Sequence, residues 1–328
     1  MAELPKKWSR RIFAVYMITT IFGGVILFLF LFLLGLLYAM NVRVPLPDHH
    51  ALLRENSDKP WLYVLAPGLD KLPPGTLQFL TAGAPSQVQR LLDVRNATRE
   101  CPVQIVISAA PTSDGRRGET SLVASLGRYP GRFWLVGRDL EKRVQKQLLP
   151  LSLRRHDGKA IFVENDTSKP FGAFCLSACT LVRSSTADGA EALAGRLARA
   201  SEVARQEGKA YPRYPEFSGM VTDWRDPPVE AMVPPASIKR WQDFCGKLLS
   251  NFPELAGIKS VEFRGSLPDP NHATLTLDSG TLRDVISQPL AEKLIEWLRR
   301  NGAEIGITSA DLPGTLKDGA GVTVNVEF

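Results

Sequence analysis

The chain is poor in the residues that hold metals or build disulfide scaffolds. Its 328 residues include 4 cysteines and 4 histidines, and there is no C-x-x-C. The histidines show no spacing of the kind that metal ligands need. They are His49, His50, His156 and His272. The sequence therefore predicts no metal site, and nothing in it points to a cofactor.

The cysteines leave several disulfide arrangements open. An even count permits two disulfides in an oxidising compartment, with three possible pairings. Cys175 and Cys179 fall in one expected strand, about 13 Å apart, which is too far for them to pair with each other. Cys245 lies on the apolar face of an expected helix, where a buried thiol is equally natural. The possible disulfide partners are Cys101, Cys175, Cys179 and Cys245.

Catalytic signatures are missing as well. The chain has no G-x-S-x-G elbow, no S-x-x-K at a helix start, no P-loop, no G-x-G-x-x-G and no H-E-x-x-H. The absence of these motifs leaves enzymatic activity open, but it favours a non-catalytic protein.

The charge balance argues against nucleic acid as a partner. The net charge is +6, but four basic residues and one acidic residue precede residue 12. The rest of the chain holds 36 basic and 33 acidic residues. A nucleic-acid-binding protein needs a clustered basic face, and the sequence offers none.

Residues 12–40 carry no charge. About 20 apolar residues suffice to cross a bilayer, so this segment predicts a transmembrane helix in contact with membrane lipid. Lys6, Lys7, Arg10 and Arg11 precede it, which predicts a cytoplasmic tail at 1–11 and an exported remainder. A cleaved signal peptide is the alternative, but its apolar core would be about 7–15 residues.

Small residues within the apolar segment form two overlapping pairs, Thr19 with Gly23 and Thr20 with Gly24. Such pairs permit close helix packing, although Gly and Thr are also common in helices that face lipid. No ionisable residue interrupts the segment, which argues against an ion or proton path.

Two sequons, at Asn96 and Asn165, would be glycosylated in a eukaryotic secretory lumen. A type II lumenal protein is therefore one alternative. The short basic tail and single anchor also fit a bacterial inner-membrane protein that faces the periplasm, which we expect.

Strands and helices alternate after a connector at 41–60. Strands are expected at 61–66, 103–109 and 132–136, with helical segments at 73–92, 120–126 and 139–149. This alternation predicts an exported α/β domain over 61–209 with a mixed, mostly parallel sheet. His156-Asp157-Gly158 predicts a hairpin that joins strands 151–155 and 159–164. A further strand at 173–183 and a helix at 187–206 complete the domain.

Residues 210–235 are rich in Pro, Tyr and Trp, lack periodicity and predict a linker. A smaller α+β module is expected at 236–328. It begins with a helix capped by Ser237, continues with strands at 261–264 and 273–277, and then forms a helix with Pro289 in its first turn. Residues 321–328 alternate and predict a final strand.

Three loops follow the expected strands of the α/β domain, at 67–70, 111–120 and 137–139. Ligands bind beyond the carboxyl ends of strands in open α/β sheets. Carboxylates there would suit a cation and guanidiniums an anion. Polar surface loops are the alternative. The candidate ligand-binding residues are Asp70, Asp114, Arg116, Arg117, Arg138 and Asp139.

Asp269-Pro270-Asn271-His272 is a D-x-x-H, similar to the last catalytic block of SGNH-type esterases and acetyltransferases. The resemblance covers four residues. The early Gly-Asp-Ser of that family is absent, so no nucleophilic serine is matched. Asp-Pro-Asn is equally a turn that precedes a strand.

Two functions follow as expectations. The first is a non-catalytic, single-pass inner-membrane protein, a subunit or scaffold of an envelope assembly for secretion, conjugation, pili or the cell wall. Its partners would be other envelope proteins or further copies of itself. The alternative is a membrane-anchored periplasmic enzyme or ligand-binding protein that uses the three loops.

Overall fold

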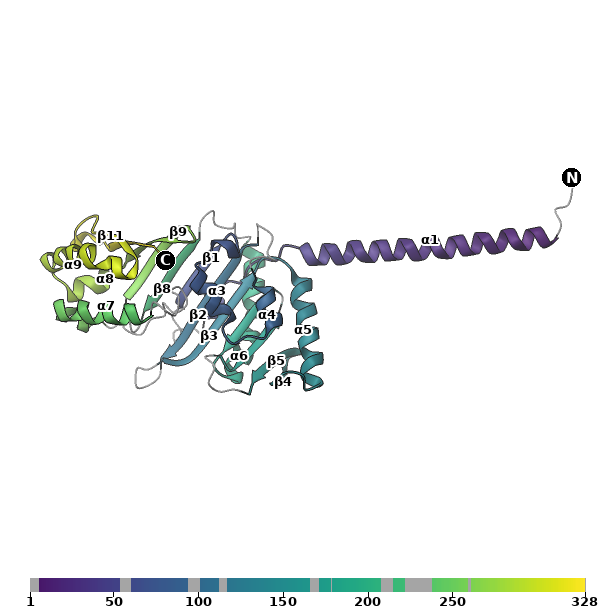
Figure 1. The fold of residues 1–328 in the computed structure, drawn as a ribbon, viewed down its shortest axis with the longest axis horizontal. Coiled ribbons are helices and arrows are strands. Elements are labelled where there is room, and N and C mark those ends of the chain that lie inside the picture. The colour runs from purple at the N-terminus through teal and green to yellow at the C-terminus, as the bar shows by residue number, and fades with distance from the viewer. Residues whose placement is uncertain are drawn as a thin grey trace.

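The computed structural model describes residues 6–53, 60–93, 101–111, 117–165, 171–177, 179–207, 215–221, 238–258 and 261–327. Its first element, α1 (Lys6–Asn41), projects as one long helix away from the rest of the described chain (Figure 1). The segment Phe13–Tyr38 is apolar, and none of it is buried. The expected apolar N-terminal helix is confirmed, and it suggests membrane anchoring or secretion.

The strands of the described residues form one 12-stranded sheet in the order β11-β12-β10-β9-β8-β1-β2-β3-β7-β6-β5-β4. Every neighbouring pair is antiparallel. The expected α/β fold with a mixed, mostly parallel sheet is therefore wrong. The N-terminal strands are β1 (Pro60–Ala66), β2 (Val103–Pro111), β3 (Arg117–Leu126), β4 (Leu151–His156), β5 (Lys159–Glu164), β6 (Ala173–Ser177) and β7 (Thr180–Ser184).

The wrong prediction of parallel strands has a physical cause in the connections between strands. Helices α3 (Pro74–Thr81) and α4 (Ser86–Leu91) lie between β1 and β2, as in a parallel crossover unit. However, β2 returns beside β1 in the opposite direction, with Ala66 opposite Val103. Alternation of strands and helices limits the order of elements, but it does not fix the direction in which the next strand enters the sheet.

Three segments also differ from the secondary structure expected for them. Residues 120–126, expected as a helix, belong to β3. Residues 132–136, expected as a strand, lie in α5 (Pro130–Gln145). Residues 173–183, expected as one strand, form the antiparallel pair β6–β7, with Cys179 at a positive φ of 67°. The hairpin between β4 and β5 is confirmed, and Asp157 and Gly158 both have positive φ.

Strand β8 (Glu216–Val221) lies within the segment expected as a linker. It pairs with β1 on one side and β9 on the other, so it joins the N-terminal and C-terminal strands into one sheet. The proposed division of the chain into domains stays a prediction. The C-terminal strands are β9 (Val261–Asp269), β10 (His272–Leu277), β11 (Ile307–Asp311) and β12 (Val322–Glu327).

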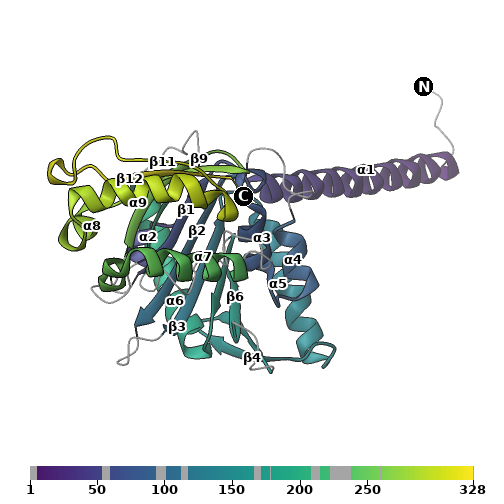
Figure 2. The ribbon, with the colours of Figure 1, turned by 60° about the vertical axis from the view of Figure 1, so that its left-hand side comes forward.

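Helices cover both faces of the N-terminal part of the sheet. Leu80, Phe133 and Leu140 bring α3 and α5 into a core on one face. Leu193 and Leu197 of α6 (Ala187–Glu207) pack on the other. A further core joins the C-terminal strands to α7 (Ile238–Asn251), α8 (Ser279–Val285) and α9 (Gln288–Asn301) (Figure 2). Short 3₁₀ turns lie at Leu69–Lys71, Pro253–Gly257, Gly302–Ile305 and Leu316–Asp318.

The segment between α1 and β1 is hydrogen-bonded to the domain. Arg43 forms a β-bridge with Arg128, and the Val44 N–H donates to the Gly127 carbonyl at 2.8 Å. Further along, Gln104 Nε2 donates to the Pro47 carbonyl at 2.7 Å. Helix α2 (His49–Leu52) then packs against α6. These contacts fix the end of α1 to the sheet domain.

Candidate functional site

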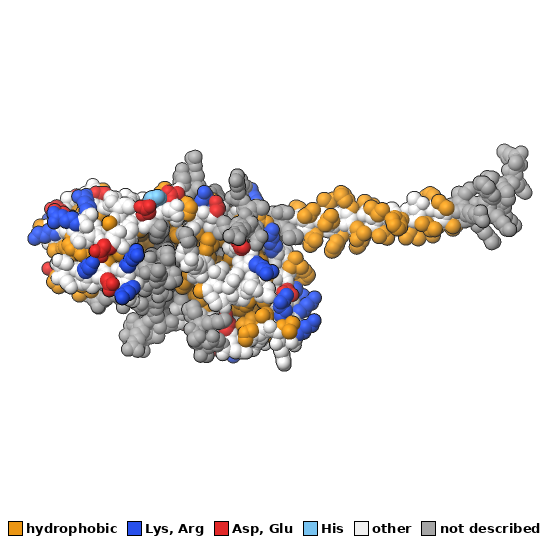
Figure 3. Space-filling model, in the orientation of Figure 1, with side chains coloured by type: hydrophobic (Ala, Val, Ile, Leu, Met, Phe, Trp, Pro, Cys, Tyr) orange, Lys and Arg blue, Asp and Glu red, His pale blue; other side chains and the backbone are white. Residues whose placement is uncertain are grey.

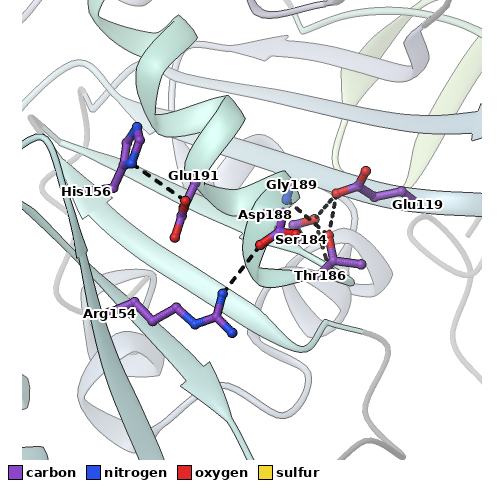
Figure 4. Close-up of polar contacts among 8 residues, drawn as sticks. All are labelled: Glu119, Arg154, His156, Ser184, Thr186, Asp188, Gly189 and Glu191. Atoms are coloured by element: carbon purple, nitrogen blue, oxygen red, sulfur yellow. Dashed lines mark hydrogen bonds and ion pairs between the residues drawn. The ribbon is translucent and has the colours of Figure 1, made fainter.

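The richest polar cluster of the described residues surrounds the N-terminus of α6 (Figure 4). Glu119 on β3 accepts hydrogen bonds through Oε1 from the Thr186 hydroxyl at 2.6 Å and the Ser184 hydroxyl at 3.1 Å. The Gly189 N–H donates to Thr186 Oγ1 at 3.0 Å. Thr186 therefore caps the helix, while the Glu119 carboxylate lies near its positive end, where an anion is favoured.

The cluster requires a glycine at position 189. A Cβ added there would overlap the Glu119 carboxylate and the Ser184 hydroxyl. Gly189 thus permits the carboxylate of β3 to approach the backbone of α6. The contact ties β3, β7 and α6 together.

The same helix contacts the β4–β5 hairpin through two pairs of polar side chains at the surface. Arg154 Nη1 lies 3.4 Å from Asp188 Oδ1, and His156 Nδ1 lies 3.6 Å from Glu191 Oε2. Arg154 and Asp188 are exposed. Exposed pairs of this kind contribute about 0–1 kcal/mol.

A carboxylate beside two hydroxyls resembles an activated nucleophile, but the geometry supports a structural cap. Ser184 is fully buried. The Thr186 hydroxyl already donates to Glu119 and accepts from Gly189. The arrangement therefore positions α6 on the sheet, with both hydroxyls donating to Glu119 and with Thr186 at the exposed surface.

A buried ion pair lies on the opposite face of the sheet. Arg183 and Glu164 are 1% and 2% exposed, and Arg183 Nη2 lies 3.9 Å from Glu164 Oε1. Arg183 Nη1 donates to the Leu80 and Ala82 carbonyls at 3.1 and 2.8 Å, at the C-terminal end of α3. Its guanidinium also stacks 4.5 Å from the Phe171 ring centroid. Burial lowers the pKa of Arg183 to about 10, so the group stays charged at neutral pH.

Of the predicted ligand residues that the structure describes, Asp70 follows β1 at one edge of the sheet, and the backbone of Arg117 lies at the other edge. Asp70 lies in a 3₁₀ turn after β1, paired with Lys71 at 3.6 Å. The antiparallel register places the end of β1 beside the start of β2, whereas Pro111 pairs with Arg117 at the far end. Asp114 and Arg116 lie outside the described residues. In an antiparallel sheet the carboxyl ends of neighbouring strands do not meet at one edge, so ligand binding by these residues stays a prediction.

Arg138 and Asp139, expected in a loop, lie within α5. Asp139 accepts a hydrogen bond from Arg143 at 2.8 Å, and Arg138 lies 3.8 Å from Glu141. These are contacts between successive turns of one helix.

The Asp269–His272 pair lies in the turn between β9 and β10. His272 Nδ1 is 2.9 Å from both Asp269 carboxylate oxygens, and both side chains are about half exposed. The hydrogen bond to Asp269 raises the pKa of His272 and lowers that of the carboxyl. The pair closes a turn, and its resemblance to a catalytic block extends no further than these contacts.

All four cysteines are buried, and the structure joins none of them in a disulfide. Burial raises the pKa of the Cys101 and Cys175 thiols to about 11 and that of Cys179 to about 12. Disulfide formation stays a prediction.

The small residues of α1 leave room for a neighbouring helix. Thr19 and Thr20 donate to carbonyls one turn earlier, and no atom lies within 4 Å of a Cβ built at Gly23 or Gly24. Packing of a second helix at Thr19, Gly23, Thr20 and Gly24 stays a prediction.

The sequence contains one local signal for each of the two clusters. Thr186 precedes a long helix, which is the position of an N-cap. Arg183 is a lone charge within a hydrophobic strand, and a charge there requires a buried partner. The partners, Glu119 and Glu164, are far away in sequence and carry no such signal.

Searches of protein-family models, curated proteins and solved structures found no match to this chain. Among the described residues, no group of three or more His, Cys, Asp or Glu side chains is arranged to hold a metal ion.

Proposed function

We propose that this chain is a non-catalytic, single-pass protein of the bacterial inner membrane and a subunit or scaffold of an envelope assembly. Helix α1 crosses the bilayer once, with residues 1–11 in the cytoplasm and the sheet domain in the periplasm. Four basic residues before the apolar segment support this direction. The apolar segment exposes its whole surface, as a lipid-facing helix does.

The fixed junction between α1 and the sheet is the observation that carries the proposal. The Arg43–Arg128 bridge and the Val44–Gly127 hydrogen bond begin two residues after α1 ends. A long, flexible linker between anchor and domain would let the domain sample a large volume, as a protein that captures diffusing substrates requires. A fixed platform instead holds a surface at one height above the membrane, which suits a stationary subunit.

The sheet also offers edges to partners. Strands β11 and β4 lie at the two ends of the strand order. Edge strands present unpaired backbone groups that can accept a strand from another chain. The alternative is a ligand site formed by loops 67–70, 111–120 and 137–139. Among the described residues, the end of β1 and the end of β2 lie at opposite edges of the sheet.

Purification from membranes in mild detergent tests the proposal. The full chain is expected to recover partner proteins, or further copies of itself, in fixed stoichiometry. A variant in which an unrelated apolar helix replaces residues 12–40 shows whether the sheet domain or α1 holds them. A wild-type protein that purifies alone as a monomer would contradict the proposal.

A further inference from the structure

Helix α5 exposes apolar side chains to an unusual degree. Outside α1, the described residues with large exposed hydrophobic side chains are Trp134, Leu135 and Leu148, at 64%, 45% and 66% exposure. Trp134 and Leu135 lie in the first turns of α5, and Leu148 follows the helix. Single exposed hydrophobic residues are ordinary, but two in adjacent positions of one helix and a third just after its end mark a surface that contacts something apolar.

The exposed face of α5 is also basic. Successive residues of a helix are about 100° apart, so the buried Phe133, Leu140 and Val144 define one side of α5. The exposed positions include Leu135, Arg138 and Lys142 on the opposite side, Trp134 at its margin and Lys146 just after the helix.

The two acidic residues of α5 lie beside this basic face and are paired. Asp139 accepts a hydrogen bond from Arg143 at 2.8 Å, and Glu141 accepts one from Arg155 at 3.2 Å. Glu141 also lies 3.8 Å from Arg138, whereas Lys142 and Lys146 form no ion pair with an acidic side chain among the described residues. The surface therefore combines aromatic and aliphatic groups with an excess of positive charge. This composition is typical of helices that lie in a membrane interface.

The chain holds α5 close to the point where α1 leaves the domain. Three residues of α1 follow Tyr38, about 4.5 Å along the axis, and Arg43 is two residues further, at most about 7 Å. Arg43 then pairs with Arg128, two residues before α5 begins at Pro130. Helix α5 also contacts α1 directly, with Cα atoms of the two helices within 8 Å of each other, and the headgroup layer is about 5–8 Å thick.

The orientation of α5 agrees with this distance. In both ribbon views α5 runs across the direction of α1, and the sheet lies on its other side (Figures 1 and 2). In the space-filling view, basic and hydrophobic side chains gather at this edge of the domain, below the root of α1 (Figure 3). The exposed face of α5 is thus turned to the side from which α1 projects.

We propose that α5 lies in the headgroup layer of the bilayer that α1 crosses, on anionic phospholipids. Trp134 and Leu135 reach the boundary of the hydrocarbon, and Arg138, Lys142 and Lys146 contact lipid phosphates. The inference rests on the proposed membrane crossing by α1. It assigns α5 a second membrane contact, which fixes the rotation of the sheet domain about the axis of α1.

Quenching of tryptophan fluorescence by brominated lipids tests the inference. The full-length protein is reconstituted in vesicles of phosphatidylcholine with phosphatidylglycerol, brominated near the headgroup end of the acyl chains. The difference between wild type and Trp134→Phe isolates the emission of Trp134. The matched control is Trp241→Phe on α7, at the end of the domain far from α1.

Strong quenching of Trp134 and none of Trp241 is the expected result. The quenching should weaken in phosphatidylcholine alone, and in Arg138→Gln/Lys142→Gln/Lys146→Gln with acidic lipid. Equal quenching with and without acidic lipid would overturn the role of anionic headgroups. If carbonate fails to extract the protein but only aqueous iodide quenches Trp134, α1 is anchored and α5 is not in the membrane. That result would overturn the inference and leave the proposed anchor intact. Protein that carbonate extracts would overturn both.

Discussion

Removal of the buried Arg183 charge should destabilise the sheet domain strongly. Arg183→Met deletes two hydrogen bonds to the Leu80 and Ala82 carbonyls and breaks the buried ion pair with Glu164. Hydrogen bonds from a charged donor contribute about 1.5–3 kcal/mol each. Breaking a buried ion pair costs about 3–5 kcal/mol in all, and we expect a loss in that range.

A double variant separates the effect of the buried charge from the effect of packing. Arg183→Met/Glu164→Leu removes both charges, and apolar replacement of a buried pair is often neutral. The Leu80 and Ala82 carbonyls still lose their donor, which costs about 1–3 kcal/mol. The double variant should therefore be more stable than Arg183→Met, although it removes more polar groups.

Thermal unfolding of the full-length protein in detergent, followed by near-ultraviolet circular dichroism, measures the effect. A loss of 1 kcal/mol shifts Tm by about 2–4 °C for a domain of 150–250 residues, so Arg183→Met should lower Tm by about 6–20 °C. The control Arg154→Met breaks an exposed pair with Asp188 and should cost less than about 1 kcal/mol. An Arg183→Met protein as stable as wild type, or a double variant as unstable as the single, would refute the reasoning.

Three further outcomes are expected. Gly189→Ala forces a methyl group against Glu119 and should lower stability by about 1–3 kcal/mol. Gly195→Ala in the same helix meets no atom and should raise stability by up to about 1 kcal/mol in thermal unfolding; equal effects at both sites would count against the cap. Buried Cys101, Cys175 and Cys179, with pKa values of about 11 to 12, should resist Ellman's reagent until the protein unfolds, and rapid reaction in the native state would show that they are accessible. In an NMR titration, His272 should titrate above the usual pKa of about 6.5, and Asp269→Asn should remove the shift; an unshifted His272 in wild type would contradict the hydrogen bond. The Asp269–His272 pair contributes its full stability below the usual pKa of histidine, as long as Asp269 is ionised. This contribution to stability disappears as the pH rises through the raised pKa of His272.

The sequence predicted elements best where a long pattern or a specific turn defined them. The uncharged segment, the Asp157-Gly158 hairpin and the helix after Thr186 all have strong local signals, and the structure contains each. Short apolar runs failed, because four to six residues fit either a buried strand or one side of a helix. Residues 132–136 illustrate this, since the helical spacing of Phe133, Leu140 and Val144 is visible only over a longer window.

The sheet topology and the polar clusters depended on contacts that the sequence does not encode locally. Cys179 turns the chain between β6 and β7 in a left-handed conformation that usually requires Gly or Asn. The hairpin was therefore hidden inside one expected strand. Glu119 accepts a hydrogen bond from Thr186, and Arg183 pairs with Glu164. Both contacts depend on the order of the strands in the complete sheet.

Compartment-specific labelling tests most directly whether α1 holds the sheet domain outside the cytoplasm. Lys293→Cys on the exposed surface of α9 and Ser9→Cys before the apolar segment provide two reporter thiols, because the natural cysteines are buried. Intact bacterial spheroplasts are treated with a maleimide that cannot cross membranes, before and after permeabilisation. We expect a membrane-bound protein that is labelled at position 293 in intact spheroplasts and at position 9 only after permeabilisation. Labelling at position 9 in intact spheroplasts with protection at 293, or recovery of the protein in the soluble fraction, would contradict the account.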